Sequence, residues 1–141
     1  MSIAGDDAPT PTVVDTPERA LGILRQRLPE IDGQRAVGLG ESWFSYAYMV
    51  DDEWIFRFPR EDSAEHAYRK ERLLLPRLAP RVDIVLPQIE HAEALPDGRT
   101  FMGHRAILGE PVTPSSIAAF PTAARDHVAT QIAEFLRAVH A

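Results

Sequence analysis

The stretch EWIFRFPR, residues 53–60, alternates apolar and other side chains with a period of two, which is typical of a β-strand. Trp54, Phe56 and Phe58 would share one face of this strand, and Ile55 and Arg57 would share the other. A charged group within an apolar strand lowers stability unless it is paired. Arg57 is therefore either half of a structural ion pair or a cation that receives an anionic ligand.

The chain on both sides of this strand alternates between the two secondary-structure periods. RAVGLGES and FSYAYMV precede it, and we expect all three runs to form consecutive antiparallel strands. DTPERALGILRQRL and EDSAEHAYRKERLLLPRLAP have helical periodicity, the first ending at Gly33 and the second ending or kinking near Pro76. Two or three strand-like runs and a last helix, TAARDHVATQIAEFLRAVHA, follow. This order predicts an α+β fold with a mainly antiparallel sheet and an inserted helix.

The composition limits the class of partner. With 141 residues, 45% of them hydrophobic and 26% charged, the chain has the size and composition of one globular domain. Its net charge of -6 argues against binding to nucleic acid or to an anionic membrane, because phosphate surfaces attract clustered cations. No run approaches the roughly 18 apolar residues of a membrane span, and the lack of cysteine fits a cytoplasmic location. Residues 1–14 do not resemble a signal peptide and are expected to form a mobile leader.

A second unexpected charge lies on the helix that follows Pro59. A helical wheel gathers the apolar residues of this helix in one sector and places Glu71 near the centre of that sector. An unpaired carboxylate there would be costly or would take up a proton, so a cation on the neighbouring sheet is the economical partner. Arg57 is the candidate, and we predict a direct ion pair. A plain structural pair remains the alternative to a ligand-binding one. The sector contains Ala64, Ala67, Leu74, Leu75 and Leu78.

The motif GLGESWFSY contains two glycines, Gly38 and Gly40, between two expected strands. Glycines let a backbone approach a ligand closely, and exposed amides in such a turn favour phosphate. A simple hairpin turn is the alternative, because Trp43 replaces the third glycine of GxGxxG. Phe44 replaces the last glycine of GxSxG, so a serine-hydrolase elbow is not expected. The five histidines have no metal-binding spacing, and no metal site is predicted.

These motifs, in this order, resemble the aminoglycoside phosphotransferases, small-molecule kinases with a protein-kinase-like fold. The resemblance extends from Arg35 to the end of the chain. It is carried by GLGES, YAYMV, WIFRFPR, KERLLLPRL, VLPQIE, FMGHRAILGEPV and IAEFLRAVHA. It implies the N-terminal nucleotide-binding lobe of such an enzyme, with a five-stranded sheet, for residues 15–109. Residues 110–141 would be a linker and the first helix of a truncated C-terminal lobe.

The resemblance also implies roles for particular residues. Gly38, Gly40 and Ser42 would belong to the loop over the ATP phosphates. Arg57 would hold the α- and β-phosphates and Glu71 would orient it, although many relatives have lysine where this chain has Arg57. At the other end of the nucleotide, side chains and backbone would contact the adenine ring. Ile55 would pack on the ring, the backbone of Arg105 and Ile107 would pair with its edge, and His104 would precede this hinge.

The catalytic part of the family pattern is missing. Relatives carry an HGDxxxxN-like loop with the catalytic aspartate and a magnesium-binding asparagine. This chain has no asparagine, no HGD and no aspartate after Asp126. Magnesium ligands are therefore expected outside this chain, and the chain alone is predicted to be inactive.

Two interpretations stay open at this point. The first is the ATP-binding part of a kinase that phosphorylates a hydroxyl of an aminoglycoside or similar molecule, with the acceptor held by the missing lobe. The second is a non-catalytic module that binds nucleotide or a protein partner. An HGDxxxxN motif encoded within about 50 residues downstream would support the first, and a stop codon after Ala141 the second. The last helix carries an apolar stripe that self-association would cover, at Val128, Ile132, Phe135, Leu136 and Val139.

Overall fold

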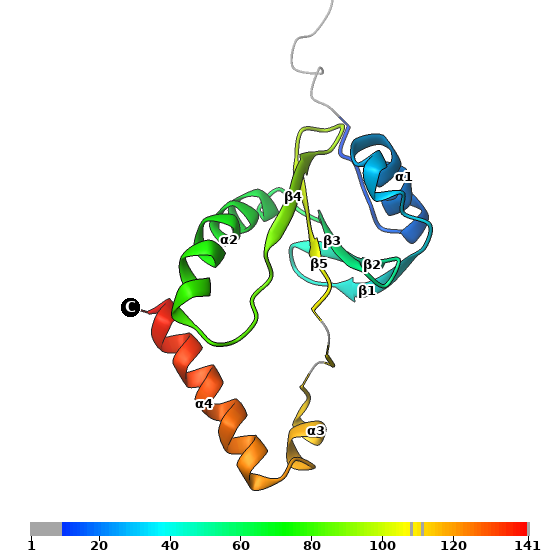
Figure 1. Ribbon diagram of the computed structural model, residues 1–141. Helices are drawn as coiled ribbons and strands as arrows, with labels where there is room; N and C mark the ends of the chain where they lie inside the picture. The colour runs from blue at the N-terminus through cyan, green and yellow to red at the C-terminus, as the bar shows by residue number, and fades with distance from the viewer. Residues whose placement is uncertain (1–9, 108, 111, 141) are drawn as a thin grey trace, which may run out of the picture.

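A five-stranded antiparallel sheet organises the chain, as the computed structural model shows for residues 10–107, 109–110 and 112–140 (Figure 1). The strand order is β1-β2-β3-β5-β4, so the second hairpin is added beside β3. The predicted α+β class and the antiparallel sheet are confirmed. The strands are β1 (Ala36–Glu41), β2 (Ser45–Val50), β3 (Trp54–Pro59), β4 (Ile89–Ala94) and β5 (Thr100–Arg105).

One face of the sheet forms the main core. Trp54, Phe56 and Phe58 are buried as the alternation predicts, with exposed fractions of 7%, 0% and 0%. They pack together with Ala20 and Leu24 of the first helix, α1 (Pro17–Arg27). Thr16 caps α1 by accepting a hydrogen bond from the Arg19 backbone N–H at 3.2 Å. The helix ends at Arg27, earlier than the predicted stop at Gly33. Pro29, which lacks a backbone N–H, begins a 3-10 turn, Pro29–Ile31, in place of a further helical turn.

The segment before α1 is held by the fold. Val14 is buried, and its carbonyl accepts a hydrogen bond from the Tyr48 hydroxyl at 2.9 Å. Burial, aided by the nearby Asp15 charge, raises the pKa of Tyr48 to about 12, so the phenol remains a donor. The backbone N–H of Thr12 donates to Oδ2 of Asp97 at 2.7 Å, and the Thr12 carbonyl accepts from Nη2 of Arg99 at 2.9 Å. The mobility expected for residues 1–14 therefore does not extend to this part, and residues 1–9 lie outside the described ranges.

The other face of the sheet carries α2 (Ala64–Leu78). Only Ala64, Tyr68 and Leu78 of this helix are buried, so its apolar sector is less covered than the wheel predicts. Pro76 lies inside the helix, which continues to Leu78 and into a 3-10 turn, Ala79–Arg81. The helix thus ends two residues after the proline, near it as expected. Pro76 removes one backbone donor, but Ala79 N–H still bonds to the Leu75 carbonyl.

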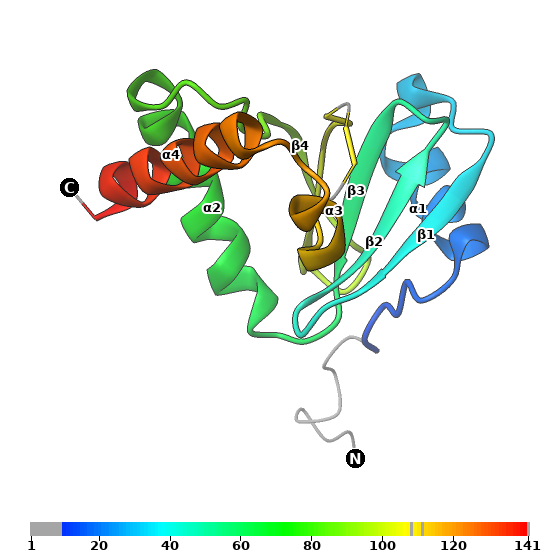
Figure 2. The ribbon, with the colours of Figure 1, turned by 90° about the horizontal axis from the view of Figure 1, so that it is seen from below.

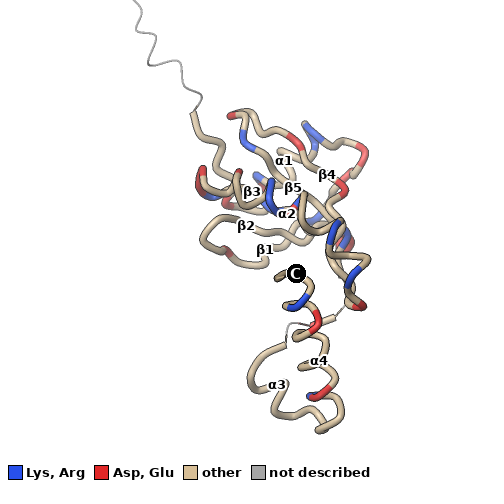
Figure 3. The backbone as a smooth tube through the Cα atoms, turned by 90° about the vertical axis from the view of Figure 1, so that its left-hand side faces the viewer, with Lys and Arg blue, Asp and Glu red and all other residues tan. Residues whose placement is uncertain are grey.

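The chain leaves the sheet after β5 and forms α3 (Pro114–Ala118) and α4 (Thr122–Val139). α4 returns toward the end of α2 (Figures 1 and 2). Arg81 and Asp83, which follow α2, line a hollow together with Glu134, Arg137 and Ala138 of α4. Charged positions are sparse along α3 and α4 (Figure 3). No residue within α4 is buried, and Ile132 and Leu136 are 52% and 49% exposed. No helix in the described part of the chain has the length and apolar character needed to span a membrane.

Candidate functional site

The ion pair predicted between Arg57 and Glu71 is present. Nη2 of Arg57 donates to Oε2 of Glu71 at 2.5 Å, with side-chain exposures of 24% and 29%. Arg57 points toward α2 because the alternation of β3 turns it away from the face that carries Phe56 and Phe58. The guanidinium also lies over the Tyr68 ring, 5.7 Å from its centroid. The cation is thus held from two sides by α2.

The ion pair leaves part of Arg57 unsatisfied. Its Nε is buried and has no hydrogen-bond partner within the described part of the chain. Buried polar atoms normally have a partner, and an unpaired donor costs about 1–3 kcal/mol. Because Nε is buried, a ligand cannot reach it, and a further acceptor would have to contact the outer guanidinium nitrogens of Arg57, whose side chain is partly exposed.

Arg57 and Glu71 line a cavity of about 630 Å³ between β1, β2, β3 and α2, here named the loop cavity. The helix contributes Ala67, Lys70, Glu71 and Leu74, whose spacing of three and four residues places them on one helical face. Four residues predicted for nucleotide binding meet here: Gly40, Ser42, Arg57 and Glu71. Lys70 was not assigned a role from the sequence, although its position three residues after Ala67 indicates this face.

The glycine segment differs from the prediction. Gly38 and Gly40 lie within β1 rather than between two strands, and a bulge separates them. Gly40 has φ of 106°, which favours glycine, and it lines the loop cavity. Gly38 pairs with Tyr48 and does not line this cavity. The connecting loop is Ser42–Phe44, in which the Ser42 hydroxyl accepts a hydrogen bond from the Ser45 N–H at 3.2 Å.

Tyr68 and Ser45 connect α2 to the sheet beside the cavity, and the sequence reading did not single them out. Their hydroxyls lie 2.5 Å apart, and both residues are buried. Burial raises the pKa of Tyr68 above its usual value, although Ser45 and Arg57 oppose this effect. Tyr68 is an aromatic residue within a mostly charged stretch of the helix, and this contrast is the sequence signal that could have identified it.

The remaining predicted residues lie outside the loop cavity. Ile55 is on the same sheet face as Arg57 and pairs directly with His104 of β5. Nδ1 of His104 is 2.8 Å from the Arg105 carbonyl oxygen. The Arg105 side chain faces away, over the Trp54 ring at 4.2 Å, and Ile107 is 43% exposed. The structure thus places Ile55, His104 and Arg105 on β3 and β5 and Ile107 beyond the end of β5, and none of the four lines the loop cavity.

The comparisons with known proteins bear on this arrangement. No protein-family model matches the chain. The GDP complex of wild-type aminoglycoside 2'-phosphotransferase-IIIa is 32% identical in sequence, with a TM-score of 0.80 over 87% of this chain. The GDP and kanamycin complex of APH(2'')-IIIa is also 32% identical, with a TM-score of 0.78 over 84% of this chain. The chain belongs to the aminoglycoside phosphotransferase family. It spans only 41% and 40% of these two structures, and within them it is the N-terminal lobe.

More distant members of the aminoglycoside phosphotransferase family share the fold. The ADP-bound structure of APH(2'')-Ib is 18% identical, with a TM-score of 0.66 over 86% of this chain and 38% of its own length. The five-stranded sheet with α2 inserted after β3 is the kinase-like N-terminal lobe, as expected.

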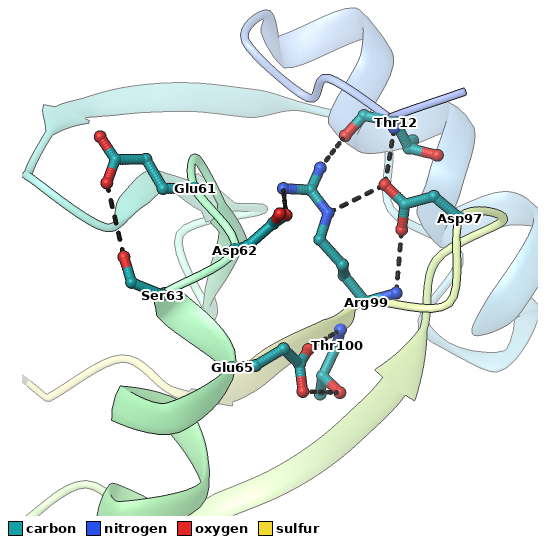
Figure 4. Close-up of polar contacts among 8 residues, drawn as sticks. All are labelled: Thr12, Glu61, Asp62, Ser63, Glu65, Asp97, Arg99 and Thr100. Carbon is teal, nitrogen blue, oxygen red and sulfur yellow. Dashed lines mark hydrogen bonds and ion pairs between the residues drawn. The ribbon is translucent and has the colours of Figure 1, made fainter. Parts of the chain in front are cut away.

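In this aminoglycoside phosphotransferase lobe, the first turn of α2 is fixed by a polar network (Figure 4). Glu65 accepts hydrogen bonds from the Thr100 backbone N–H and, at 3.3 Å, from its hydroxyl. Nη1 of Arg99 lies 3.7 Å from Oδ1 of Asp62, and Nε of Arg99 lies 2.9 Å from Oδ2 of Asp97. Burial alone would raise the pKa of Asp97, but hydrogen bonds from Thr12 and Arg99 lower it below its usual value. The β4–β5 hairpin thereby positions the start of the helix that carries Glu71.

The described part of this lobe contains no group of three or more histidine or acidic side chains arranged to hold a metal ion. The carboxylates of the loop cavity, Glu41 and Glu71, are paired with Arg60 and Arg57. The other polar groups of its lining are cations, hydroxyls and backbone amides, among them those of Gly40, Ser42 and Lys70. Such groups bind an anion rather than a metal.

Proposed function

We propose that the chain is the ATP-binding N-terminal part of a small-molecule kinase that transfers the γ-phosphate to a hydroxyl of an aminoglycoside or similar acceptor. The observation that carries this proposal is Arg57, which Glu71 holds at the wall of the loop cavity with part of its side chain exposed. Its planar guanidinium suits a pyrophosphate, since it offers several donors in a fixed plane. The similar structures are GDP complexes, which supports a nucleotide at this site but does not select ATP over GTP.

The remaining predicted residues would divide the nucleotide between them. Gly38, Gly40 and Ser42 would belong to the loop over the phosphates, with contacts through backbone amides and the Ser42 hydroxyl. Ile55 would pack on the base, next to His104, and the backbone at Arg105 and Ile107 would pair with its edge. These roles remain proposals. Of these residues, Gly40, Ser42, Arg57 and Glu71 line the loop cavity.

Catalysis would need groups that this chain does not supply. Mg²⁺ would neutralise charge on the transferred phosphoryl group, with its ligands and the catalytic base outside these residues. This chain would contribute binding and orientation of the nucleotide. We expect weak ATP binding and no phosphotransferase activity by the chain alone, and a cytoplasmic location where ATP is available.

The test is a titration of the purified chain with a fluorescent ATP analogue, followed by displacement with ATP and with GTP. Arg57→Ala should weaken binding by about ten-fold or more, because it removes a charge-assisted contact. Arg69→Ala is the matched control, since Arg69 is an exposed arginine of α2 that does not line the loop cavity. Equal binding by wild type and Arg57→Ala would reject the proposed site. Robust phosphorylation of kanamycin by the chain alone would reject the assignment of catalysis to a missing lobe.

A further inference from the structure

A second cavity lies on another side of α2. It has a volume of about 650 Å³ and is here named the rear cavity. The helix contributes Arg72, Leu75, Pro76 and Ala79, again three and four residues apart and therefore on one helical face. The chain from Leu86 to Ala92 forms the opposite wall. The loop cavity and the rear cavity share no lining residue.

The rear cavity has the properties of a small-molecule site. Its volume falls within the range of about 300–1,000 Å³ that is typical of such sites. Most of its wall is apolar, with side chains from Leu75, Pro76, Leu86, Pro87 and Ile89. Few polar groups interrupt this wall, and such groups fix the orientation of a bound molecule.

Arg72 is the cation of this cavity. Its side chain is half-buried, and its Nη1 donates a long hydrogen bond of 3.5 Å to Sδ of Met102. A thioether sulfur is a weak acceptor. No carboxylate of the described residues lies within 4 Å of its guanidinium, in contrast to the contact of Arg57 with Glu71. Arg72 therefore keeps most of its donors available for an anion.

Glu90 is the acid of the rear cavity, and it shares the cation Arg105 with Glu53, which makes the closer contact. Its Oε2 lies 3.8 Å from Nε of Arg105. Gln88, the other polar residue of the lining, is neutral and can donate or accept. No ion pair of the described residues joins Glu90 to Arg72, so the guanidinium of Arg72 remains the cation that can meet an anionic ligand.

We propose that the rear cavity is a binding site for a small molecule that combines an apolar body with a carboxylate. The carboxylate would accept two hydrogen bonds from the fork of Arg72, a geometry that favours carboxylates. The apolar body would pack against Leu75 and Ile89. This site is separate from the proposed nucleotide site and does not depend on it.

The experiment uses the complete 141-residue chain and two probes of equal shape, 3-phenylpropionate and the neutral 3-phenylpropionamide. Binding is followed by ¹H–¹⁵N NMR, up to about 10 mM of each probe, which covers weak specific affinities. We expect shifts clustered at residues 72–79 and 86–92, and about ten-fold or tighter binding of the carboxylate. Equal affinity for the two probes, shifts located elsewhere, or no shifts would overturn the proposal.

Two variants test whether Arg72 causes the preference for the carboxylate probe over the amide. Arg72→Gln should remove the preference for the carboxylate and leave the weak binding of the amide. Arg69→Gln, an exposed arginine one turn earlier that lines neither cavity, should keep the preference. A preference that survives in Arg72→Gln would contradict the assigned role. The two probes on the unaltered chain still decide the question if Arg72→Gln does not fold.

Discussion

Nη2 of Arg57 on β3 lies 2.5 Å from Oε2 of Glu71 on α2, and this contact joins the sheet to the helix beside the loop cavity. The pair is neither fully exposed nor fully buried, so its coupling should exceed that of a surface pair. A double-mutant cycle with Arg57→Ala and Glu71→Ala, measured by urea unfolding, should give about 1–2 kcal/mol. The exposed pair Arg19 and Asp15 is the control and should give about 0.3–0.5 kcal/mol. Equal coupling in both pairs would contradict this expectation.

Lys70 is the only lysine of the chain and lines the loop cavity, so it can report on nucleotide binding. Its ammonium group should pair with the phosphates of a bound nucleotide, which lowers the rate of acylation by an amine-reactive ester. We expect saturating ATP to slow labelling of Lys70 several-fold, as measured by peptide mass spectrometry. Adenosine should not protect, and the α-amino group is the internal control. Protection by adenosine equal to that by ATP would exclude a phosphate contact.

Gly103 lies where β5 passes the ring of Phe56. A Cβ at position 103 would come within 2.2 Å of Cε1 of this buried ring, so Gly103→Ala forces the sheet or the ring to shift. We expect a loss of about 1–3 kcal/mol in the free energy of unfolding, as for an overpacked core. Gly22 of α1 has open space around its Cα, so Gly22→Ala should instead stabilise by about 0.5–1 kcal/mol. Thermal or urea unfolding distinguishes the opposite signs.

Asp97 makes stability dependent on pH in the acid range. Its pKa in the folded chain is lowered from 3.8, so the folded state favours the carboxylate. Its contribution is present above the unfolded pKa of about 3.9 and is lost as pH falls toward the lower folded pKa. Asp97→Asn should destabilise the chain by about 1–3 kcal/mol at neutral pH and flatten the decline in stability below about pH 4. A variant that retains the full acid dependence would show that other carboxylates cause it.

The exposed stripe of α4 predicts self-association of the chain. Ile132 and Leu136 are about half exposed, and burial of such residues against a second copy would stabilise a helix that is marginal alone. Sedimentation should show concentration-dependent association, and Ile132→Glu should reduce it. Hydrogen exchange along α4 should slow as the concentration rises. A monodisperse monomer with a protected α4 would instead support a self-contained module.

The sequence predicted the sheet and the ion pair because both follow from local patterns. Alternation along β3 identified Arg57, and the helical period identified Glu71. Local sequence patterns could not predict the two cavities, because a cavity depends on the distance between α2 and the elements that face it. Tyr68 and Ser45 were missed for the same reason: their contact joins elements 23 residues apart. Proline chemistry placed the end of α2 near Pro76 but not at a particular residue, because the bond from Ala79 N–H to the Leu75 carbonyl still forms.

The structure brings some of the proposed site residues together and leaves others apart. Four of them meet in one cavity: Gly40, Ser42, Arg57 and Glu71. The bulge in β1 and the alternation of side chains along β3 both direct residues toward α2, the helix that carries Glu71. Ile55, His104, Arg105 and Ile107 were assigned through the family resemblance, and their roles remain predictions. They flank a site that would be completed by chain outside these residues, so no local pattern could test them.

Glu71 and Arg72 are consecutive residues that line different cavities, and this makes the length of α2 as important as its composition. Each residue turns a helix by about 100°, so deletion of one residue in the first turns would rotate everything after it. Arg72 would then occupy the place of Glu71 and meet Arg57, cation against cation. Substitutions on the exposed surface of α2 should therefore be tolerated far better than single-residue insertions or deletions between Ala64 and Lys70.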